Sequence, residues 1–491
     1  MSLTRLCWIA LLILCFVYLL ILQVQAVWPF TIDDMYITLR YAKHWATGLG
    51  LLWNVGESPV EGYSNFSFLL LGRLAYFLNV DPVLMLKGVG VVGLWMLTGA
   101  LFLLSRLWVR ARFALIPCVW LLAYRGQILW TVSGLETAVY EALVVFSVYF
   151  LLRGLGYRAY PLERSEYRMR WFAFAGVCLA VAGMTRPEAL ALMVLFLGLV
   201  AVGRWRSWRG FCVFGGVLAL CFLPYFIWRW HYFGRLFPNP VYCKGLVDPW
   251  NLHLDRAYLC LAWPFMVCAL LALWRQRGRG FDFLVWPSVL YLVLCVGADP
   301  VVAFYNRLFL PAFALLLPLA LNGIMRVVAR EWLVYVVSLL MLVVFIPTLS
   351  LAGYRHFTEN PQSGEQLRKR VVTWLFHHTA HGERVVLADS GLIPYRSSLR
   401  FTDSYCLNNA AMTQGPREGM YTRFCQKALL SKPDVIILTA LVVDGVAQYT
   451  PADMCLAEQL NHQSFYHMHV TFSSKKQTQS YYRYSIYKAI K

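Results

Sequence analysis

Long apolar runs recur along most of this 491-residue chain, and they constrain its fold more than any other feature. A helix that crosses a bilayer core about 30 Å thick needs about 20 apolar residues. The sequence contains eleven such runs, two of them short, at about 6–28, 83–105, 113–130, 136–153, 171–185, 187–203, 210–228, 257–274, 283–297, 307–325 and 332–353. We therefore predict a mainly α-helical, polytopic membrane protein with about eleven transmembrane helices.

The first run has an alternative interpretation as a signal peptide. Arg5 precedes it, and Val24-Gln25-Ala26 resembles a cleavage site. However, its uncharged stretch from Leu6 to Leu22 is longer than the roughly 7–15 apolar residues usual in a signal peptide. We therefore favour a retained first helix.

The positive charge of the chain follows the loops between these runs. The formal net charge is +19, although only 14% of the residues are charged. Five short loops that follow every second run hold sixteen arginines: Arg106, Arg110, Arg112, Arg153, Arg158, Arg164, Arg168, Arg170, Arg204, Arg206, Arg209, Arg275, Arg277, Arg279, Arg326 and Arg330. The positive-inside rule places these loops and the N-terminus in the cytoplasm. The charge thus reports topology, and we expect no nucleic-acid partner.

The alternation of loops holds only if the short apolar segment 65–78 does not cross the membrane, so we expect an interfacial or re-entrant helix there. The polar tail, about 354–491, then lies outside. Its strand-like runs at Arg384–Ala388 and Asp434–Leu438 predict a small α/β domain after a membrane domain at 1–353. In this tail Cys406 and Cys425 could pair with each other or with Cys455, or all three could be free thiols.

The first outer loop, about 29–82, holds an aspartate pair directly after the first run. We expect Thr31 to cap a helix whose first turn holds Asp33 and Asp34 and which ends at Gly48. Asp33, Arg40 and His44 would lie near one face of that helix. The two acids could merely complement the helix dipole, but a desolvated carboxylate beside a cation is also a candidate general base.

Further polar residues gather on the same outer side of the membrane. The candidates for donor-phosphate or substrate binding are Arg40, His44, Glu61, Asn65, Glu136, Arg186, Glu188, Tyr242, Lys244, Asp299 and Arg307. Each has an ordinary structural interpretation, such as a turn ion pair or a cation at the membrane interface. Their clustering on one side is the main functional signal. Asp33, Asp34 and Asp299 could also supply oxygen ligands to a divalent cation, although the sequence identifies no certain cofactor.

These residue types suit the transfer of a sugar from a lipid phosphate. Arginine or lysine would neutralise the departing phosphate, and one carboxylate would deprotonate the acceptor hydroxyl. A single displacement of this kind inverts the anomeric carbon. The chain contains no P-loop, so ATP-driven transport has no support.

The order of these motifs resembles the GT-C glycosyltransferases, and most closely their terminal arabinofuranosyltransferase group. The resemblance covers about residues 30–315 and rests on Asp33–Ala42, Gly48-Leu49-Gly50, Trp53-Asn54, Glu61–Asn65, Ser133–Thr137, Thr185–Glu188, Pro238-Asn239 with Tyr242 and Lys244, and Gly297–Asp299 with Arg307. The sequence departs from the family pattern in two places. Cys243 lies where a small or aliphatic residue is expected, and the apolar pair Val301-Val302 follows Asp299-Pro300.

This resemblance implies a GT-C bundle with an extracytoplasmic C-terminal domain in the cytoplasmic (inner) membrane of a bacterium. It also implies a polyprenyl-phosphate donor, with arabinofuranose as the expected sugar and mannose as an alternative. An aspartate of the Asp33-Asp34 pair would be the base, and the acceptor would be a cell-envelope glycan or protein. The alternatives from other classes are a lipid-linked sugar flippase and a non-catalytic assembly protein. No convincing internal repeat supports a transporter.

Overall fold

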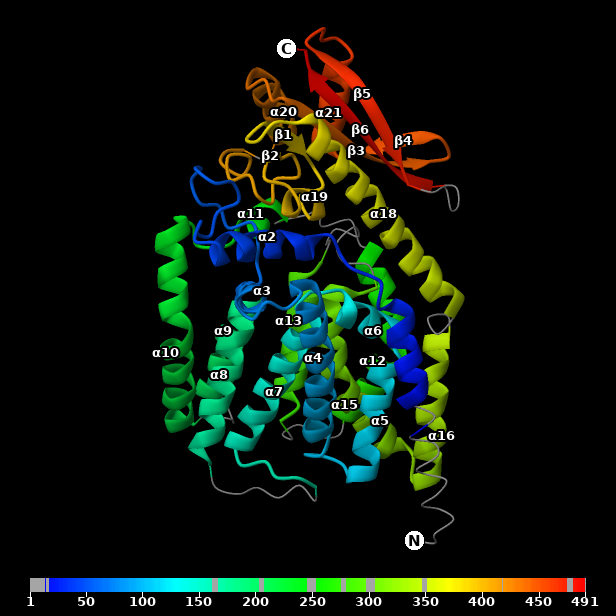
Figure 1. Ribbon diagram of the computed structural model, residues 1–491. Helices are drawn as coiled ribbons and strands as arrows, with labels where there is room; N and C mark the ends of the chain where they lie inside the picture. Colours follow the sequence, from blue (N-terminus) through cyan, green and yellow to red (C-terminus); the bar gives the residue numbers. More distant parts are fainter. Residues whose placement is uncertain are drawn as a thin grey trace. The chain divides into compact units, whose positions relative to one another are not determined.

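The computed structural model describes residues 14, 17–160, 167–202, 207–244, 253–274, 280–296, 305–346, 351–416, 418–474 and 480–490, without the side chains of 244, 253–255, 351–362 and 480. It divides into two compact units (Figure 1). The helical unit comprises Met1–Pro29, Lys87–Ile227 and Leu246–Arg355. The sheet unit comprises Phe30–Leu86, Trp228–Gly245 and His356–Lys491, so it combines three distant parts of the sequence.

The helical unit contains the apolar runs, and every run is helical over at least part of its length. Its helices are Val17–Val27, α4 (Pro82–Ser105), α5 (Ala111–Ala123), α6 (Arg125–Val132), α7 (Thr137–Gly154), α8 (Met169–Thr185), α9 (Ala189–Ala201), α10 (Trp208–Phe233), α12 (His253–Trp274), α13 (Asp282–Leu294), η2 (Arg307–Phe309), α15 (Leu310–Val327), α16 (Glu331–Met341) and η3 (Leu342–Phe345). Among the described residues, five helices are long and apolar enough to cross a membrane. A sixth span results if α5 and α6 are counted as one bent pair. That all eleven runs cross stays a prediction.

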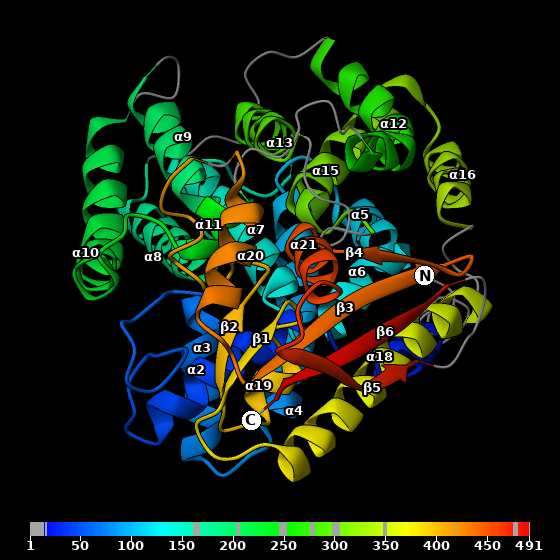
Figure 2. The ribbon, with the colours of Figure 1, turned by 90° about the horizontal axis from the view of Figure 1, so that it is seen from above.

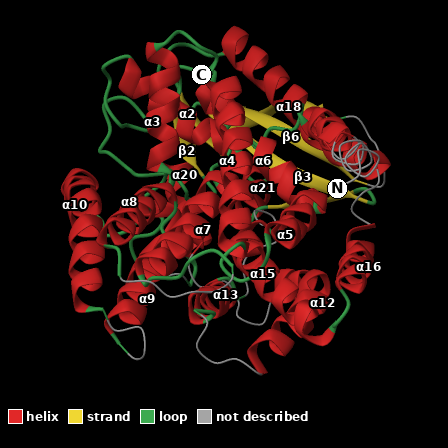
Figure 3. Cartoon of the chain, turned by 90° about the horizontal axis from the view of Figure 1, so that it is seen from below, coloured by secondary structure: helices red, strands yellow, loops and turns green. Residues whose placement is uncertain are grey.

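Helix α15 lies at the centre of the helical unit. Every residue from Leu310 to Ile324 is buried, as expected for a helix that is apolar all round. It packs against α5, α7, α12, α13 and α16 (Figure 3). At Gly323 a Cβ atom would lie 1.7 Å from the backbone oxygen of Cys268, so glycine permits the close approach of α15 and α12.

The predicted run 113–130 is broken rather than continuous. Helices α5 and α6 meet at an angle of 68°, and Tyr124 between them has an extended backbone. Arg125 follows directly, and its guanidinium lies 5.2 Å from the ring centre of Tyr305. A charge inside an apolar run is costly unless the fold gives it partners, and the break places it beside an aromatic face.

The sheet unit is built on six strands, β1 (Arg384–Leu387), β2 (Arg400–Asp403), β3 (Val435–Val443), β4 (Val446–Tyr449), β5 (Tyr466–Ser473) and β6 (Ser480–Ala489). Their order is β2-β1-β3-β6-β5, and β4 pairs with the end of β3. β2, β1 and β3 are parallel to one another, β6 is antiparallel to β3, and β5 is antiparallel to β6. The strand predictions near 384–388 and 434–438 are confirmed by β1 and β3.

Helices from the C-terminal part of the chain and from the first outer loop belong to the same unit as this sheet. The later helices are α18 (Leu351–His378), α19 (Leu392–Tyr395), α20 (Met420–Leu430) and α21 (Pro451–Leu460). α18 runs along β5 and β6 (Figure 2), while α20 and α21 share a buried apolar cluster with β1 and β3. The earlier helices of this unit are α2 (Asp34–Ala46), α3 (Phe66–Phe77) and α11 (Asn239–Lys244). α3 is thus a helix at the segment expected to be interfacial or re-entrant.

Candidate active site

The aspartate pair lies at the beginning of α2. The helix begins at Asp34 with Asp33 in the N-cap position, so the expected capping by Thr31 is wrong. The expected end is confirmed, because Thr47 closes the helix and Gly48 follows with a φ of +80°. The Asp33 carboxylate accepts no hydrogen bond from the backbone N–H groups of the first turn of α2, since it binds other partners.

Those partners come from the C-terminal part of the chain. Asp33 Oδ1 accepts a hydrogen bond of 3.0 Å from the Leu392 backbone N–H and lies 3.2 Å from Arg368 Nε. The same Nε donates to Asp389 Oδ2 at 2.7 Å, and the Tyr484 hydroxyl donates to that oxygen too. We call Asp33, Arg368, Asp389 and Tyr484 the aspartate cluster; its members come from α2, α18, the segment after β1, and β6.

Two carboxyl groups thus share one guanidinium in a poorly solvated place. Burial raises the pKa of Asp33 to about 8, and the neighbouring Asp389 adds to this shift while Arg368 opposes it. Burial alone would also raise the pKa of Asp389, but Arg368 and the Tyr484 hydroxyl hold it below its usual value. Asp33 is therefore the acid of this cluster whose protonated form burial favours, while Arg368 favours the ionised form of Asp389.

Asp34 differs from its neighbour in the same turn. It is half-buried, and within the described part of the chain no ion pair or hydrogen bond engages its carboxylate. Residues Met35–Ala42, which follow it, are all buried. The two adjacent aspartates therefore have different environments, one fixed by the aspartate cluster and one available.

Arg40 and His44 are held by backbone carbonyls of the sheet unit. The buried Arg40 guanidinium donates to Trp53 O (2.9 Å), to Leu399 O (3.2 Å) and to Pro394 O, and it lies over the Trp53 ring. His44 Nδ1 is 2.8 Å from Leu52 O. Asp33 and Arg40 do face the same segment, 391–399, as a shared helix face predicts. The cation beside Asp33 is however Arg368, and the contacts of Arg40 do not favour binding of a donor phosphate.

Glu61 and Asn65 also have structural partners in the first outer loop. Glu61 accepts hydrogen bonds of 3.0 and 3.2 Å from Arg229 Nε, and both side chains are at most 4% exposed. Asn65 is the N-cap residue of α3, and its side-chain oxygen accepts a 2.8 Å bond from Thr38 Oγ1. Since a buried ion pair with several hydrogen bonds satisfies its own charges, these contacts hold the loop.

A second group of predicted residues lies together in the helical unit. Glu136 Oε1 is 3.0 Å from both Arg186 Nη1 and Arg307 Nη2, and Arg186 also donates to Glu188 Oε1 at 2.6 Å. We call Glu136, Arg186, Glu188 and Arg307 the arginine cluster. The Arg307 guanidinium lies over the Trp130 ring, 4.8 Å from its centre.

The remaining predicted residues are less informative. The Tyr242 hydroxyl accepts a 3.3 Å bond from the Phe237 N–H, and Arg235 lies over the Tyr242 ring. Lys244 ends α11, and its side chain lies outside the described residues, as does the whole of Asp299. Among the described residues no group of three or more histidine, cysteine or acidic side chains is arranged to hold a metal ion. A cation at Asp33, Asp34 and Asp299 stays a hypothesis.

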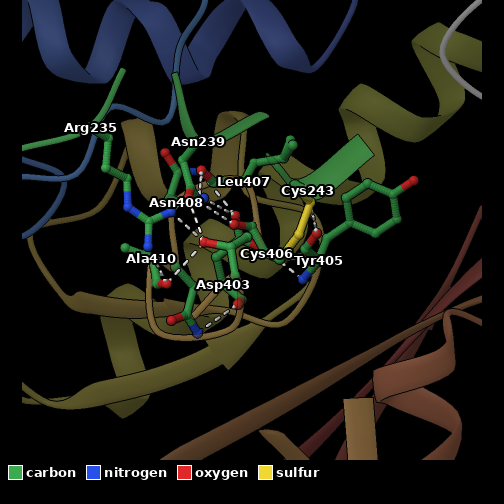
Figure 4. Close-up of a disulfide and its surroundings, with 11 residues drawn as sticks. Arg235, Asn239, Cys243, Asp403, Tyr405, Cys406, Leu407, Asn408 and Ala410 are labelled. Carbon is green, nitrogen blue, oxygen red and sulfur yellow. Dashed lines mark hydrogen bonds between the residues drawn. A yellow bond between two sulfur atoms is a disulfide. The ribbon is translucent and has the colours of Figure 1, made fainter. Parts of the chain in front are cut away.

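The segment after β2 is fastened to α11 by a disulfide (Figure 4). Cys243 pairs with Cys406, and Asn239 Nδ2 donates to the backbone oxygens of Cys406 and Leu407 at 2.7 and 3.0 Å. Arg235 adds a bond to Ala410 O. The cysteine that departed from the family pattern therefore has a partner 163 residues away. A second disulfide, Cys425–Cys455, joins α20 to α21 and is one of the pairings left open by the sequence.

Sequence reasoning missed Arg229, Arg368, Asp389 and Tyr484. Arg229 lies near the end of an apolar run, where an arginine suggests a loop boundary rather than a partner for Glu61. Asp389 left a weak signal: it follows the parallel strand β1 and precedes the glycine that opens α19. Side chains at the carboxyl ends of parallel strands often belong to sites.

Comparison with known proteins gives a family for the tail and a fold for the whole chain. A family described as "Domain of unknown function (DUF8728)" matches residues 355–487. No curated protein matches the sequence. Among solved structures, ArnT from Cupriavidus metallidurans bound to undecaprenyl phosphate has 12% sequence identity and a TM-score of 0.61, with 97% of this chain and 98% of that chain covered.

Two further structures agree with this result. The oligosaccharyltransferase AglB from Archaeoglobus fulgidus, in complex with an inhibitory peptide and a dolichol-phosphate, has 11% identity and a TM-score of 0.55 over 92% of this chain and 75% of that chain. The arabinofuranosyltransferase AftD from Mycobacteria has 15% identity and a TM-score of 0.52 over 96% of this chain, which spans only 41% of AftD. This multi-pass membrane protein has the fold of the GT-C glycosyltransferases.

Proposed function

We propose that this protein is an inverting glycosyltransferase that moves a sugar from a polyprenyl-phosphate donor to an acceptor on the outer face of the membrane. The observation that carries the proposal is the Asp33-Asp34 turn at the start of α2, in a chain with the GT-C fold. One carboxylate of this turn is fixed by Arg368 and the Leu392 N–H, and the adjacent carboxylate is available for proton transfer.

Asp34 is the base in this proposal. It would accept the proton of the acceptor hydroxyl while that oxygen attacks the anomeric carbon and the lipid phosphate leaves. The phosphate departs as an anion that needs no proton, so one carboxylate is sufficient. Attack opposite to the leaving phosphate inverts the configuration of the anomeric carbon.

Arg186 and Arg307 are the proposed ligands of the donor phosphate. Guanidinium groups bind phosphate with paired, charge-assisted hydrogen bonds. Both arginines already contact Glu136, which orients them. Lys244 and Tyr242 stay candidates from the sequence, whereas the backbone contacts of Arg40 favour a structural role.

The nature of the donor is supported by two of the structural neighbours. ArnT is bound to undecaprenyl phosphate in one structure, and AglB to a dolichol-phosphate in another. The sequence motifs favour arabinofuranose as the sugar, with mannose as the alternative. A cell-envelope glycan or a protein is the proposed acceptor.

The two disulfides support the outer location of the sheet unit. Disulfides persist in oxidising compartments such as the periplasm and are rare in the cytosol. Cys243–Cys406 and Cys425–Cys455 both lie in the sheet unit. This argument is independent of the loop arginines, and both support a C-terminus outside the cytoplasmic membrane. An alkaline phosphatase fused after Lys491 should then be active, and an inactive fusion would reverse the topology.

The transfer itself can be tested with purified protein in liposomes. The donors would be decaprenyl-phosphoryl arabinofuranose and decaprenyl-phosphoryl mannose, each with a radiolabelled sugar, and the acceptor would be a cell-envelope extract. We expect label from one donor to become covalently attached to acceptor, and Asp34→Asn to prevent it. No covalent transfer from either donor would contradict the proposal. Movement of intact labelled lipid across the bilayer without transfer would indicate a flippase instead.

A further inference from the structure

The segment 355–487, which matches a domain of unknown function, provides three of the four side chains of the aspartate cluster. We propose that this segment is part of the active site, in which Arg368, Asp389 and Tyr484 are positioning residues that fix the Asp33-Asp34 turn. The inference rests on the proposed function, because it assigns these residues to the same base.

The first support is the way in which Arg368 joins two carboxylates. Its Nε lies 2.7 Å from Asp389 and 3.2 Å from Asp33, and its side chain is only 17% exposed. The Tyr484 hydroxyl holds Asp389 from the other side. Because Asp389 is bound by both groups, it fixes the orientation of the Arg368 guanidinium that contacts Asp33. A guanidinium oriented in this way restricts the rotamer of the Asp33 side chain.

The second support is a close backbone contact at the same place. The Leu392 N–H donates to Asp33 Oδ1. At Gly391 a Cβ atom would lie 2.1 Å from Asp33 Oδ2 and 2.3 Å from the Asp33 backbone oxygen. The chain at 391–392 therefore touches both the carboxylate and the backbone of Asp33, which a residue larger than glycine would prevent.

Residues that follow 391–392 in the chain also bind the middle of α2 and the loop after it. Arg40 donates to the carbonyls of Pro394 and Leu399. Asn54 forms two bonds of 3.0 Å with the backbone of Phe401, one in each direction. Residues 391–401 thus bind both the first turn of α2 and the loop that follows it. The 355–487 segment therefore determines where Asp34, one residue from Asp33, is held.

This arrangement gives the outer segment a chemical role besides any binding of acceptor. A base must stand within hydrogen-bond reach of the hydroxyl that it deprotonates. Displacement of a catalytic group by about 1 Å can lower a rate by about 100-fold. Loosening of Arg368 should therefore reduce turnover while the donor still binds.

The test compares Arg368→Met, Arg368→Lys and Tyr484→Phe with Lys369→Met as a matched control. Lys369 is the next residue on α18, and its exposed side chain pairs with Glu365 on the same helix. We expect Arg368→Met to lower kcat by about 10- to 100-fold with the donor KM within about twofold of wild type. Tyr484→Phe should have a smaller effect in the same direction, Arg368→Lys should recover part of the loss, and Lys369→Met should behave as wild type.

The pH profile separates positioning from general loss of structure. Among the described residues, the charged or titratable groups in and around this turn include Asp33, Asp34, Tyr36, Glu365, Arg368, Asp389, Asp453, Tyr482 and Tyr484. Removal of Arg368 should move the acid limb of kcat/KM to higher pH, because the carboxyls lose their cation. An unchanged kcat and pH profile in folded Arg368→Met and Tyr484→Phe would overturn the inference, as would the same loss in Lys369→Met.

A readout that needs no activity keeps this inference separate from the proposed function. Hydrogen exchange of the amides of Met35–Ile37 should be faster in Arg368→Met than in wild type, and unchanged in Lys369→Met. If wild type transfers no sugar, the proposed function fails whatever the exchange shows. If wild type transfers sugar but exchange and kcat are unaffected in Arg368→Met, only the positioning role fails.

Discussion

The aspartate cluster and the arginine cluster are both buried groups of charge, but their charges balance differently. In the arginine cluster two guanidinium groups face two carboxylates, so every charge has a partner. In the aspartate cluster two carboxyls share Arg368, and Asp34 stands beside them as a third acid. A surplus of acid can take up or release a proton near neutral pH, whereas paired arginines cannot. This difference is the reason for proposing a base beside the aspartate cluster rather than in the arginine cluster.

Glu136→Gln tests the balance of the arginine cluster and should have the largest effect on stability. It leaves two buried guanidiniums with Glu188 alone, and an arginine cannot lose its proton to relieve the imbalance. We expect unfolding to become easier by about 3–5 kcal/mol, measured by thermal unfolding in detergent. The donor KM should rise as well, because both arginines lose their orientation. A loss below about 1 kcal/mol would show that the cluster does not need its charges matched.

Arg368→Met removes a charge from the aspartate cluster in the same way. It should reduce the free energy of unfolding by less than Glu136→Gln does. The remaining carboxyls can share a proton, so we expect a loss of about 1–3 kcal/mol. Without their cation the pKa of Asp33 rises further above its unfolded value, and the pKa of Asp389 rises from its lowered value. Stability is therefore retained at acid pH and lost as the pH rises. Unfolding temperatures at pH 6 and pH 8.5 should show a larger deficit at pH 8.5. A deficit independent of pH would contradict the shared proton.

The sequence predicts more members of the arginine cluster than of the aspartate cluster. The physical reason is that most members of the aspartate cluster are far apart in the sequence. Asp33 and Asp34 were found because a helix start has a local signature, and Glu136, Arg186 and Arg307 because span ends place them on one side. The apolar runs likewise predict helices, since periodicity and length are local properties. Arg368 and Asp389 are over 330 residues from Asp33, and nothing local indicates that they meet it. The Cys243–Cys406 pair and the break at Tyr124 depend on tertiary packing in the same way.

Asp453 offers a third case for comparison: it is buried, and its hydrogen-bond partners in the described part of the chain are polar groups rather than a cation. Its oxygens accept bonds from Ser404 Oγ (2.9 Å) and the Thr439 N–H (2.8 Å), and burial raises its pKa to about 7. The folded protein therefore keeps a proton that the unfolded chain releases near pH 4, so stability falls as the pH rises from about 4 to 7. Asparagine in its place is neutral at every pH, and its oxygen can accept from the Thr439 N–H while its NH2 donates to Ser404 Oγ.

We therefore expect Asp453→Asn to resemble wild type at pH 5 and to unfold at a higher temperature at pH 8.5. The gain should be about 2–4 °C, the shift that about 1 kcal/mol produces in a domain of 150–250 residues. The measurement is thermal unfolding at both pH values. An equal gain or an equal loss at the two values would mean that Asp453 is ionised in the folded protein throughout.

The central claim is that the two adjacent aspartates do different work because the 355–487 segment holds only one of them. The most direct measurement is the turnover of Asp33→Asn and Asp34→Asn, side by side with wild type, in liposomes at saturating donor and matched protein amounts. Asp34→Asn should lose about 10²- to 10⁴-fold, the contribution of a general base. Asp33→Asn should retain measurable turnover, reduced by about tenfold through looser positioning. Loss of turnover in Asp33→Asn with near-normal turnover in Asp34→Asn would reverse the assignment and contradict the account.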